Sequence, residues 1–318
     1  MGLKVKIKAK KDDALTLDEC FEAFLTEKQA VNKSATTIAA YTYSYDKWHD
    51  YLEKSGYSLA AKDVDASYIY SFSTHLLEEI KPTSINSYLR HLRSFLYWCM
   101  EHKYVEQFKI KLLTVQETVK EVYTDDELER LLRHPSRTAS FVEWRSWAVI
   151  NWILATGNRA GTVVAVLIGD INFARKEIYI NRTKTNKGMT LPLSTALANC
   201  LTEYIKKYRS EALPTDYLFP NVGDLPLTVP ALKSSIAAYN KSRDVDKTSI
   251  HLFRHTYAKL FLMNSGDVFR LQKILGHSTL DMTRKYVNLF LEDLKQDYDN
   301  YSPLDNIKRK TSRTHKIK

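Results

Sequence analysis

The densest chemistry in the sequence lies in its last third. Residues 251–255 read His-Leu-Phe-Arg-His, and Gly276 and His277 follow after a further stretch of helical pattern. If residues 251–255 are helical, His251 and Arg254 lie three residues apart on one face, so that an imidazole and a guanidinium project together. An imidazole can transfer a proton near neutral pH, and a forked guanidinium binds phosphate or carboxylate oxygens.

Each of these residues also has an ordinary structural explanation. His251 alone is more often a satisfied helix histidine, Arg254 alone is usually a surface or salt-bridge arginine, and Tyr286 is one of 20 tyrosines. The order along the chain favours a site: Arg159 after a glycine turn, Lys184 on a hairpin, the 251–255 motif, His277 at a tight corner, and Tyr286 nine residues later.

The elements that position these residues begin with an all-helical first half. Thr16 opens a capping box with Glu19, and Ser34 can cap the next helix. Apolar residues then recur at helical spacing, which predicts helices over residues 16–30, 34–56, 65–80 and from Pro82 to about Cys99.

The fourth of these helices carries a candidate phosphate-binding face. Between residues 81 and 111 there are six cations against two acids, and Lys81, Arg90 and Arg93 belong to this set. The alternative is a solvated helix with scattered lysines and arginines.

The second half is predicted to be a separate, largely helical domain. A connector of mixed character precedes the capping box that begins at Thr124. An apolar helix over residues 144–155 is ended by Gly157, which can adopt the left-handed conformation. Residues 170–193 change to a strand pattern around a turn, which predicts a small hairpin that carries Lys184 and Lys187. The expected fold class is therefore mainly α with a small β-hairpin or sheet.

Composition excludes several classes of protein. A chain of 318 residues suggests two domains at roughly 150 residues each, and no apolar run or signal peptide indicates a membrane protein. Its three cysteines lie far apart, which suggests neither disulfides nor a zinc site and fits the cytoplasm. The net charge of +10 comes from acid-free termini with 11 cations, while the remaining 36 cations nearly match 37 acids. Such termini suggest nucleic acid or an anionic membrane face, although solvated tails are also common.

In these motifs the sequence resembles the tyrosine recombinases, or phage-type integrases, including the Xer-like recombinases. The resemblance implies a two-domain DNA clamp. It assigns a basic arm to residues 1–11, a helical core-binding domain to 12–110, a linker to 111–121, an α-rich catalytic domain to 122–304 and a basic tail to 305–318. The residues that carry the likeness are Ala155–Arg159, Thr183–Lys187 with Leu191–Leu193, His251–His255, Leu275–His277 and Tyr286.

The resemblance implies a role for each motif residue. Tyr286 would be the nucleophile that keeps the phosphate as an ester, and Arg159 and Arg254 would clamp the scissile phosphate. His251 would accept or relay the proton of the nucleophile, and His277 would hydrogen-bond the phosphate. Lys184 would protonate the departing 5′ oxygen, and Lys187 would be either the alternative proton donor or a DNA-binding residue. The product would be a 3′-phosphotyrosyl link.

The resemblance also implies the partners. We expect a homo-tetramer on double-stranded DNA sites, an accessory protein for directionality or DNA bending, a nucleoid-associated cytoplasmic location, and no membrane, metal, ATP or other cofactor. Residues 289–304 are expected to form a helix that docks on a neighbouring protomer or packs on its own domain.

The sequence departs from the family pattern at one position of consequence. Thr162 stands three residues after Arg159, where the family often has an acid, and Asp170 is a substitute only if the fold brings it close. His255 is expected to have a packing or supporting role. Competing functions are a non-catalytic architectural DNA-binding protein, a relaxing enzyme similar to a type IB topoisomerase, and a metal-dependent nuclease, for which no convincing carboxylate cluster is visible.

Overall fold

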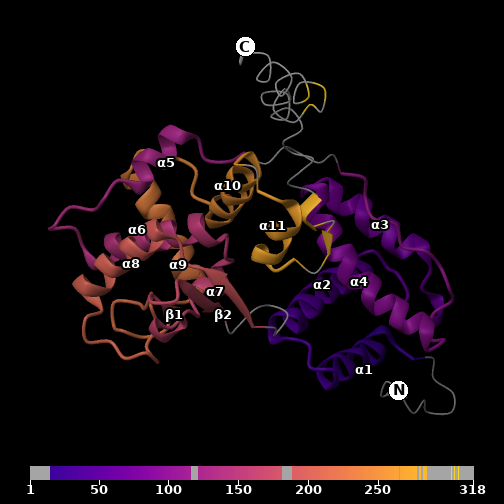
Figure 1. Cartoon of the computed structure of the whole chain (residues 1–318). Coiled ribbons are helices and arrows are strands. Elements are labelled where there is room, and N and C mark those ends of the chain that lie inside the picture. The colour runs from indigo at the N-terminus through magenta and orange to yellow at the C-terminus, as the bar shows by residue number, and fades with distance from the viewer. Residues whose placement is uncertain are drawn as a thin grey trace. The chain divides into compact units, whose positions relative to one another are not determined.

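The computed structural model describes residues 15–115, 121–180, 188–264, 266–277, 279–280, 282–284, 302, 304 and 307. The chain divides into two compact units, Met1–Thr118 and Val119–Lys318 (Figure 1). Lys184, Lys187, Tyr286, residues 1–11 and most of residues 289–318 lie outside the described residues.

The N-terminal unit consists of helices, as predicted. Thr16 and Glu19 form the predicted capping box, and the Ser34 hydroxyl accepts the amide of Thr37. Trp48, with no exposed surface, lies in an aromatic core that the helices share. The elements are α1 (Leu17–Ala30), α2 (Ala35–Lys54), a short 3-10 helix η1 (Ala61–Asp63), α3 (Ala66–Leu77) and α4 (Pro82–Glu101).

The C-terminal unit combines helices with a small antiparallel sheet. The predicted hairpin is confirmed, with Ile178 opposite Leu191, and a third strand precedes it in the order β1-β2-β3. The strands are β1 (Ile171–Asn172), β2 (Glu177–Ile180) and β3 (Met189–Pro192), and the 3-10 helix η2 (Ile168–Asp170) leads into β1. The helices are α5 (Asp125–Leu132), α6 (Phe141–Thr156), α7 (Ala160–Val163), α8 (Thr195–Tyr208), α9 (Val229–Ser242), α10 (Ile250–Met263) and α11 (Val268–Leu275).

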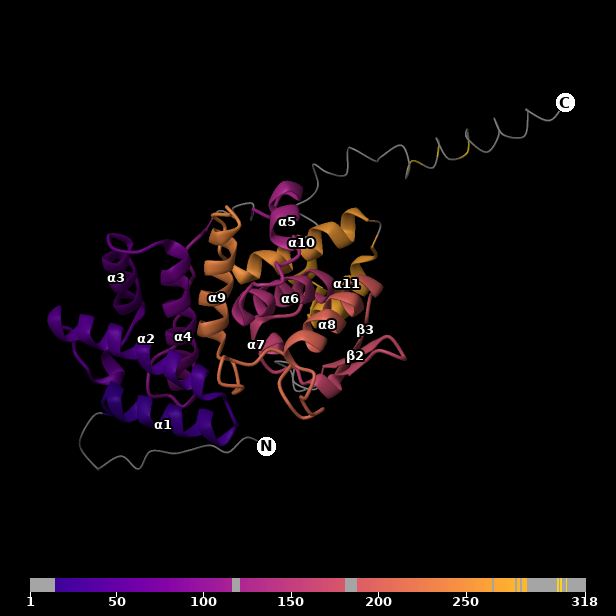
Figure 2. The same cartoon turned by 90° about the vertical axis from the view of Figure 1, so that its left-hand side faces the viewer.

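Helix α6 is the centre of this unit. It packs against α5, α8, α9 and α10, and Figure 2 shows it enclosed by these helices. Its side chains are apolar on nearly every side, as in Trp152 and Ile153, which is the pattern of a helix surrounded by protein. Because α6 is held on all sides, its C-terminal end is a fixed point from which the chain turns toward Arg159.

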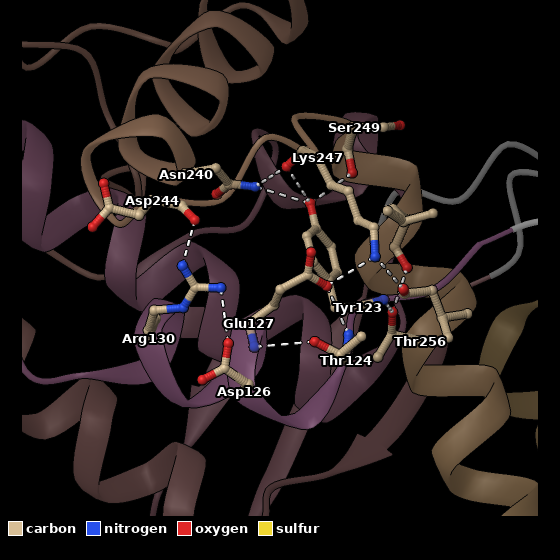
Figure 3. Close-up of polar contacts among 12 residues, drawn as sticks. Tyr123, Thr124, Asp126, Glu127, Arg130, Asn240, Asp244, Lys247, Ser249 and Thr256 are labelled. Atoms are coloured by element: carbon tan, nitrogen blue, oxygen red, sulfur yellow. Dashed lines mark hydrogen bonds and ion pairs between the residues drawn. The ribbon is translucent and has the colours of Figure 1, made fainter.

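A buried polar network fixes the start of α10 (Figure 3). The Tyr123 hydroxyl donates to the carbonyl of Lys247 at 3.1 Å and accepts the side-chain amide of Asn240 at 2.9 Å. The Tyr123 backbone amide donates to the Thr256 hydroxyl, and the Lys247 ammonium donates to Glu127. Burial raises the pKa of the Tyr123 phenol, so the hydroxyl remains protonated and keeps donating. The helix that carries His251 and Arg254 is thus held at its first turns.

Candidate active site

Arg254 joins three segments of the chain. It lies in the first turns of α10, and only 5% of its surface is exposed. Its Nη1 donates to the carbonyl of Gly157 at 2.6 Å, and its Nη2 donates to the carbonyl of Leu275 at 2.9 Å and to His277 Nε2 at 2.8 Å. Since a guanidinium is a rigid, planar fork of donors, these bonds fix its plane as well as its position.

The two carbonyls are available because they lie at helix ends. The last carbonyls of an α-helix have no partner within the helix and need donors from elsewhere. Gly157 ends α6 and Gly276 ends α11, both in the left-handed conformation with φ of 65° and 61°. The glycines of the two sequence motifs therefore turn the chain where the arginine binds, and the carbonyls of Gly157 and Leu275 meet its guanidinium.

Arg159 approaches the same point from another element. It is the half-buried residue that precedes α7, with extended backbone, and its Nη1 donates to the Leu275 carbonyl at 3.4 Å. Both arginines therefore bind one carbonyl oxygen, although they are far apart in sequence. Two guanidinium groups gathered at one place make a positive site that suits an oxyanion such as phosphate.

His277 completes this corner. Its side chain is buried, with 9% of the residue exposed, and its Nδ1 lies 2.8 Å from the hydroxyl oxygen of Thr283. Burial, and then the charges of Arg254 and Arg159, lower the pKa of His277 to about 4. The imidazole is therefore neutral at pH 7 in the DNA-free protein.

His277 should make the protein less stable in acid. Its pKa is about 4 in the folded state and about 6.5 in an unfolded chain, so only the unfolded chain binds the proton between these values. The stability that the protein has because His277 is neutral when folded is fully present above pH 6.5, and it is lost as the pH falls toward 4. Between pH 7 and pH 4.5, we expect the free energy of unfolding of His277→Asn to fall by about 2 kcal/mol less than that of the wild type, as measured by urea unfolding. An equal acid loss in the two proteins would contradict the assignment.

The other predicted residues differ in their surroundings. The helical prediction for residues 251–255 is confirmed, but His251 is exposed in the first turn while Arg254 is buried. Helical spacing predicted that His251 and Arg254 lie on one side of α10. They differ in burial because Arg254 donates to three acceptors inside the protein. His255 is half-buried, and its supporting role stays a prediction. By sequence, Lys184 lies in the connection between β2 and β3, where it is not described.

Thr162 and Asp170 lie on one cavity. Asp170 is 9% exposed, and its carboxylate accepts the amide of Leu167 at 2.9 Å. The cavity has a volume of about 170 Å³ and is also lined by Ile180, the last residue of β2, and by Tyr217. The fold thus places Asp170 on the same cavity as Thr162, the threonine three residues after Arg159. That it orients Arg159 or Lys184 remains a prediction.

The candidate DNA-binding residues of the N-terminal unit lie on or beside α4. Lys81 and Arg90 are exposed, and Arg93 is half-buried. Their contact with phosphates stays a prediction.

Within the part of the chain that the structure describes, two observations concern metal ligands and membrane helices. One group of three potential metal ligands lies within reach of a shared ion there, His49, Asp50 and Glu53 on α2, and it belongs to the other unit. No described helix is long and apolar enough to cross a membrane.

Sequence comparison identifies relatives over most of the chain. Residues 121–292, more than half of the chain, match the phage integrase family. The tyrosine recombinase XerD of Staphylococcus haemolyticus is 26% identical over 279 residues, which cover 85% of this chain and 93% of the relative. XerD of Staphylococcus aureus strain COL is also 26% identical, over 278 residues, with the same coverage of 85% and 93%.

Solved structures share the fold. The XerH site-specific recombinase bound to its palindromic difH substrate has a TM-score of 0.68 at 18% identity, covering 89% of this chain and 84% of that one. A lambda integrase tetramer bound to a Holliday junction has a TM-score of 0.67 at 15% identity, covering 86% of this chain and 78% of that one. The predicted fold class, mainly α with a small β-sheet, is confirmed. The chain that places two arginines and a histidine at one corner belongs to the phage integrase family, the tyrosine recombinases.

Proposed function

We propose that the protein is a site-specific DNA recombinase that cleaves and rejoins duplex DNA through a 3′-phosphotyrosyl intermediate, without metal or ATP. The observation that carries this proposal is the meeting of Arg159 and Arg254 at the Leu275 carbonyl, with His277 bound to Arg254. Three of the N–H groups of Arg254 hold it in place before any substrate arrives. A site organised in advance stabilises developing negative charge without reorganising during the reaction.

The reaction assigns one role to each residue. The Tyr286 oxygen attacks the scissile phosphorus, a new P–O bond forms, and the bond from phosphorus to the 5′ oxygen breaks. His251, exposed at the start of α10, takes the phenolic proton, and Lys184 gives a proton to the departing 5′ oxygen. Rejoining reverses these steps with the 5′ hydroxyl of a partner strand. The energy of the broken phosphodiester bond is thus conserved in the phosphotyrosyl bond, and no cofactor is consumed.

The partners follow from the same proposal. We infer that the protein binds double-stranded DNA at the nucleoid and acts as a homo-tetramer, in line with the DNA-bound lambda integrase tetramer that shares its fold. Residues 12–110 form the core-binding domain and residues 122–304 the catalytic domain. In the core-binding domain, affinity comes from contacts to the DNA phosphate backbone made by Lys81, Arg90 and Arg93. An accessory protein that bends DNA or sets direction completes the assembly.

The test is a covalent trap in EDTA. The full chain is incubated with nicked duplexes from the DNA that flanks its own gene, and an adduct that resists SDS is isolated. We expect the adduct to form without metal, and we expect mass spectrometry of its peptides to place the DNA on Tyr286.

Three outcomes would contradict the proposal in different ways. Binding to every duplex without an adduct would favour the architectural protein. An adduct with relaxation of supercoils but no exchange between two sites would favour the topoisomerase-like enzyme. Cleavage only when Mg²⁺ is restored would favour the nuclease.

A further inference from the structure

Thr283 holds the side of His277 that faces away from Arg254. The residue has no exposed surface, and its hydroxyl oxygen lies 2.8 Å from His277 Nδ1. On the other side of the ring, Nε2 lies 2.8 Å from Arg254 Nη2. Both ring nitrogens are thus engaged, one by a hydroxyl and the other by a cation. Thr283 was not among the residues that the sequence singled out.

The contact with Arg254 determines where the ring proton lies. A guanidinium only donates hydrogen bonds, so Nε2 must present its lone pair to Arg254. Because the low pKa of His277 leaves the ring neutral at pH 7, the ring carries a single proton, and that proton lies on Nδ1. The Nδ1–H group therefore donates to the Thr283 oxygen.

We propose that Thr283 is a positioning residue whose oxygen accepts the Nδ1 proton of His277, so that Nε2 can take up a second proton from solvent when a DNA phosphate enters the site. This inference rests on the proposed function, because it requires that a phosphate binds there. A phosphate oxygen that enters between the two side chains accepts the Arg254 Nη2–H group in place of Nε2, and it repels the Nε2 lone pair that this exchange leaves bare. The proton comes from the buffer, and the resulting imidazolium donates from Nε2 to the phosphate and from Nδ1 to Thr283.

The groups around the ring explain why the hydroxyl is needed. Among the described residues, Arg254 from α10 and Arg159 from the start of α7 both oppose protonation of His277. The phosphate anion offsets these two charges when it binds, and the Thr283 oxygen accepts the Nδ1 proton in both states. A side chain of the same shape without the oxygen would take this acceptor away from the Nδ1–H of the imidazolium.

The experiment compares Thr283→Val with Thr283→Ser in the full chain. The matched control is Thr202→Val, which removes an exposed hydroxyl on α8 that binds only the local Ala198 carbonyl among the described contacts. The first readout is the protonation of the His277 ring nitrogens, measured by NMR with ¹⁵N-labelled histidine in the DNA-free protein. The second is the rate of covalent adduct formation from pH 5.5 to 8.5 at saturating protein.

We expect wild type and Thr283→Ser to carry the proton on Nδ1 and to share one pH profile. In Thr283→Val we expect the proton to stay on Nδ1, because Nε2 still accepts from Arg254, but we expect an adduct rate at pH 7.5 lower by about ten-fold and a profile shifted about one pH unit to the acid side. Thr202→Val should match the wild type in both readouts.

Two results would overturn the inference. One is a wild-type ring protonated on Nε2 in the DNA-free protein, and the other is a Thr283→Val variant whose pH profile equals that of the wild type. If the wild type forms no adduct on any duplex, the proposed function fails. The NMR spectrum of the DNA-free wild type then still decides whether the ring proton lies on Nδ1, where the Thr283 oxygen can accept it.

Discussion

Replacing Arg254 with lysine should slow covalent adduct formation by about 10²–10³-fold. The guanidinium reaches the carbonyls of Gly157 and Leu275 and the Nε2 of His277 at once, on two other segments of the chain. A lysine ammonium concentrates its donors on one nitrogen at the end of a flexible chain, so it cannot reproduce this fork or the bidentate grip on a phosphate. DNA binding should change little, because contacts to the rest of the DNA backbone supply most of the affinity.

Lysine is more informative than alanine at this position. Arg254→Ala would leave two carbonyls at helix ends and a buried imidazole without their donor, at a cost of about 1–3 kcal/mol for each unsatisfied group. Lost folding would then be confused with lost chemistry. Arg145→Lys is the matched control, because Arg145 is equally buried and binds the Pro220 carbonyl and the Ser235 hydroxyl, with none of the site residues among these partners.

Single-turnover kinetics on the nicked duplex, thermal melting and gel-shift binding together measure these effects. Arg145→Lys should melt at a lower temperature than the wild type and form the adduct at the wild-type rate while it remains folded. An Arg254→Lys rate within about three-fold of the wild type would show that the guanidinium does not act on the phosphate.

The sequence allowed the elements to be predicted wherever the signal is local. Thr16 and Thr124 each form the capping box that their spacing indicated, and Gly157 ends α6 in the left-handed conformation. Caps and turns depend on neighbouring residues, so they are visible in a single sequence. Strand β1 was not predicted because Ile171–Asn172 is too short to show a period.

The junction at the site could not be predicted in this way. Arg159 and Arg254 meet at the backbone carbonyl of Leu275, and a carbonyl is the same for every residue type, so the sequence holds no sign of it. Thr283 follows His277 by six residues across a corner, which is neither a helix nor a strand spacing. Helical spacing also says which face of α10 carries Arg254 but not how deeply it is buried. Family motifs supply the residue types, and only the fold supplies their shared acceptor.

Gly157→Ala should destabilise the protein by about 3 kcal/mol, whereas Gly276→Ala should cost only about 1 kcal/mol. Both glycines end a helix with positive φ, 65° and 61°, so any other residue pays the same left-handed strain at either site. They differ in the space around them. A Cβ at Gly157 would lie 2.5 Å from the Tyr257 ring and 2.6 Å from the Leu275 side chain, whereas the nearest atom at Gly276 is the Met189 sulfur at 3.9 Å.

The clash at Gly157 should also reach the chemistry. Relieving it requires Tyr257 or Leu275 to move, and the Leu275 carbonyl holds both arginines. We therefore expect the adduct rate of Gly157→Ala to fall at a temperature where urea unfolding shows the variant to be fully folded. Equal urea midpoints for the two alanine variants would mean that the side chains around Gly157 can move to accept a Cβ without lowering the free energy of unfolding. A shift of about 1 Å in a catalytic site can lower the rate 10²-fold. If Gly157→Ala is destabilised but forms the adduct at the wild-type rate, then the positions of the two arginines do not depend on the position of Leu275.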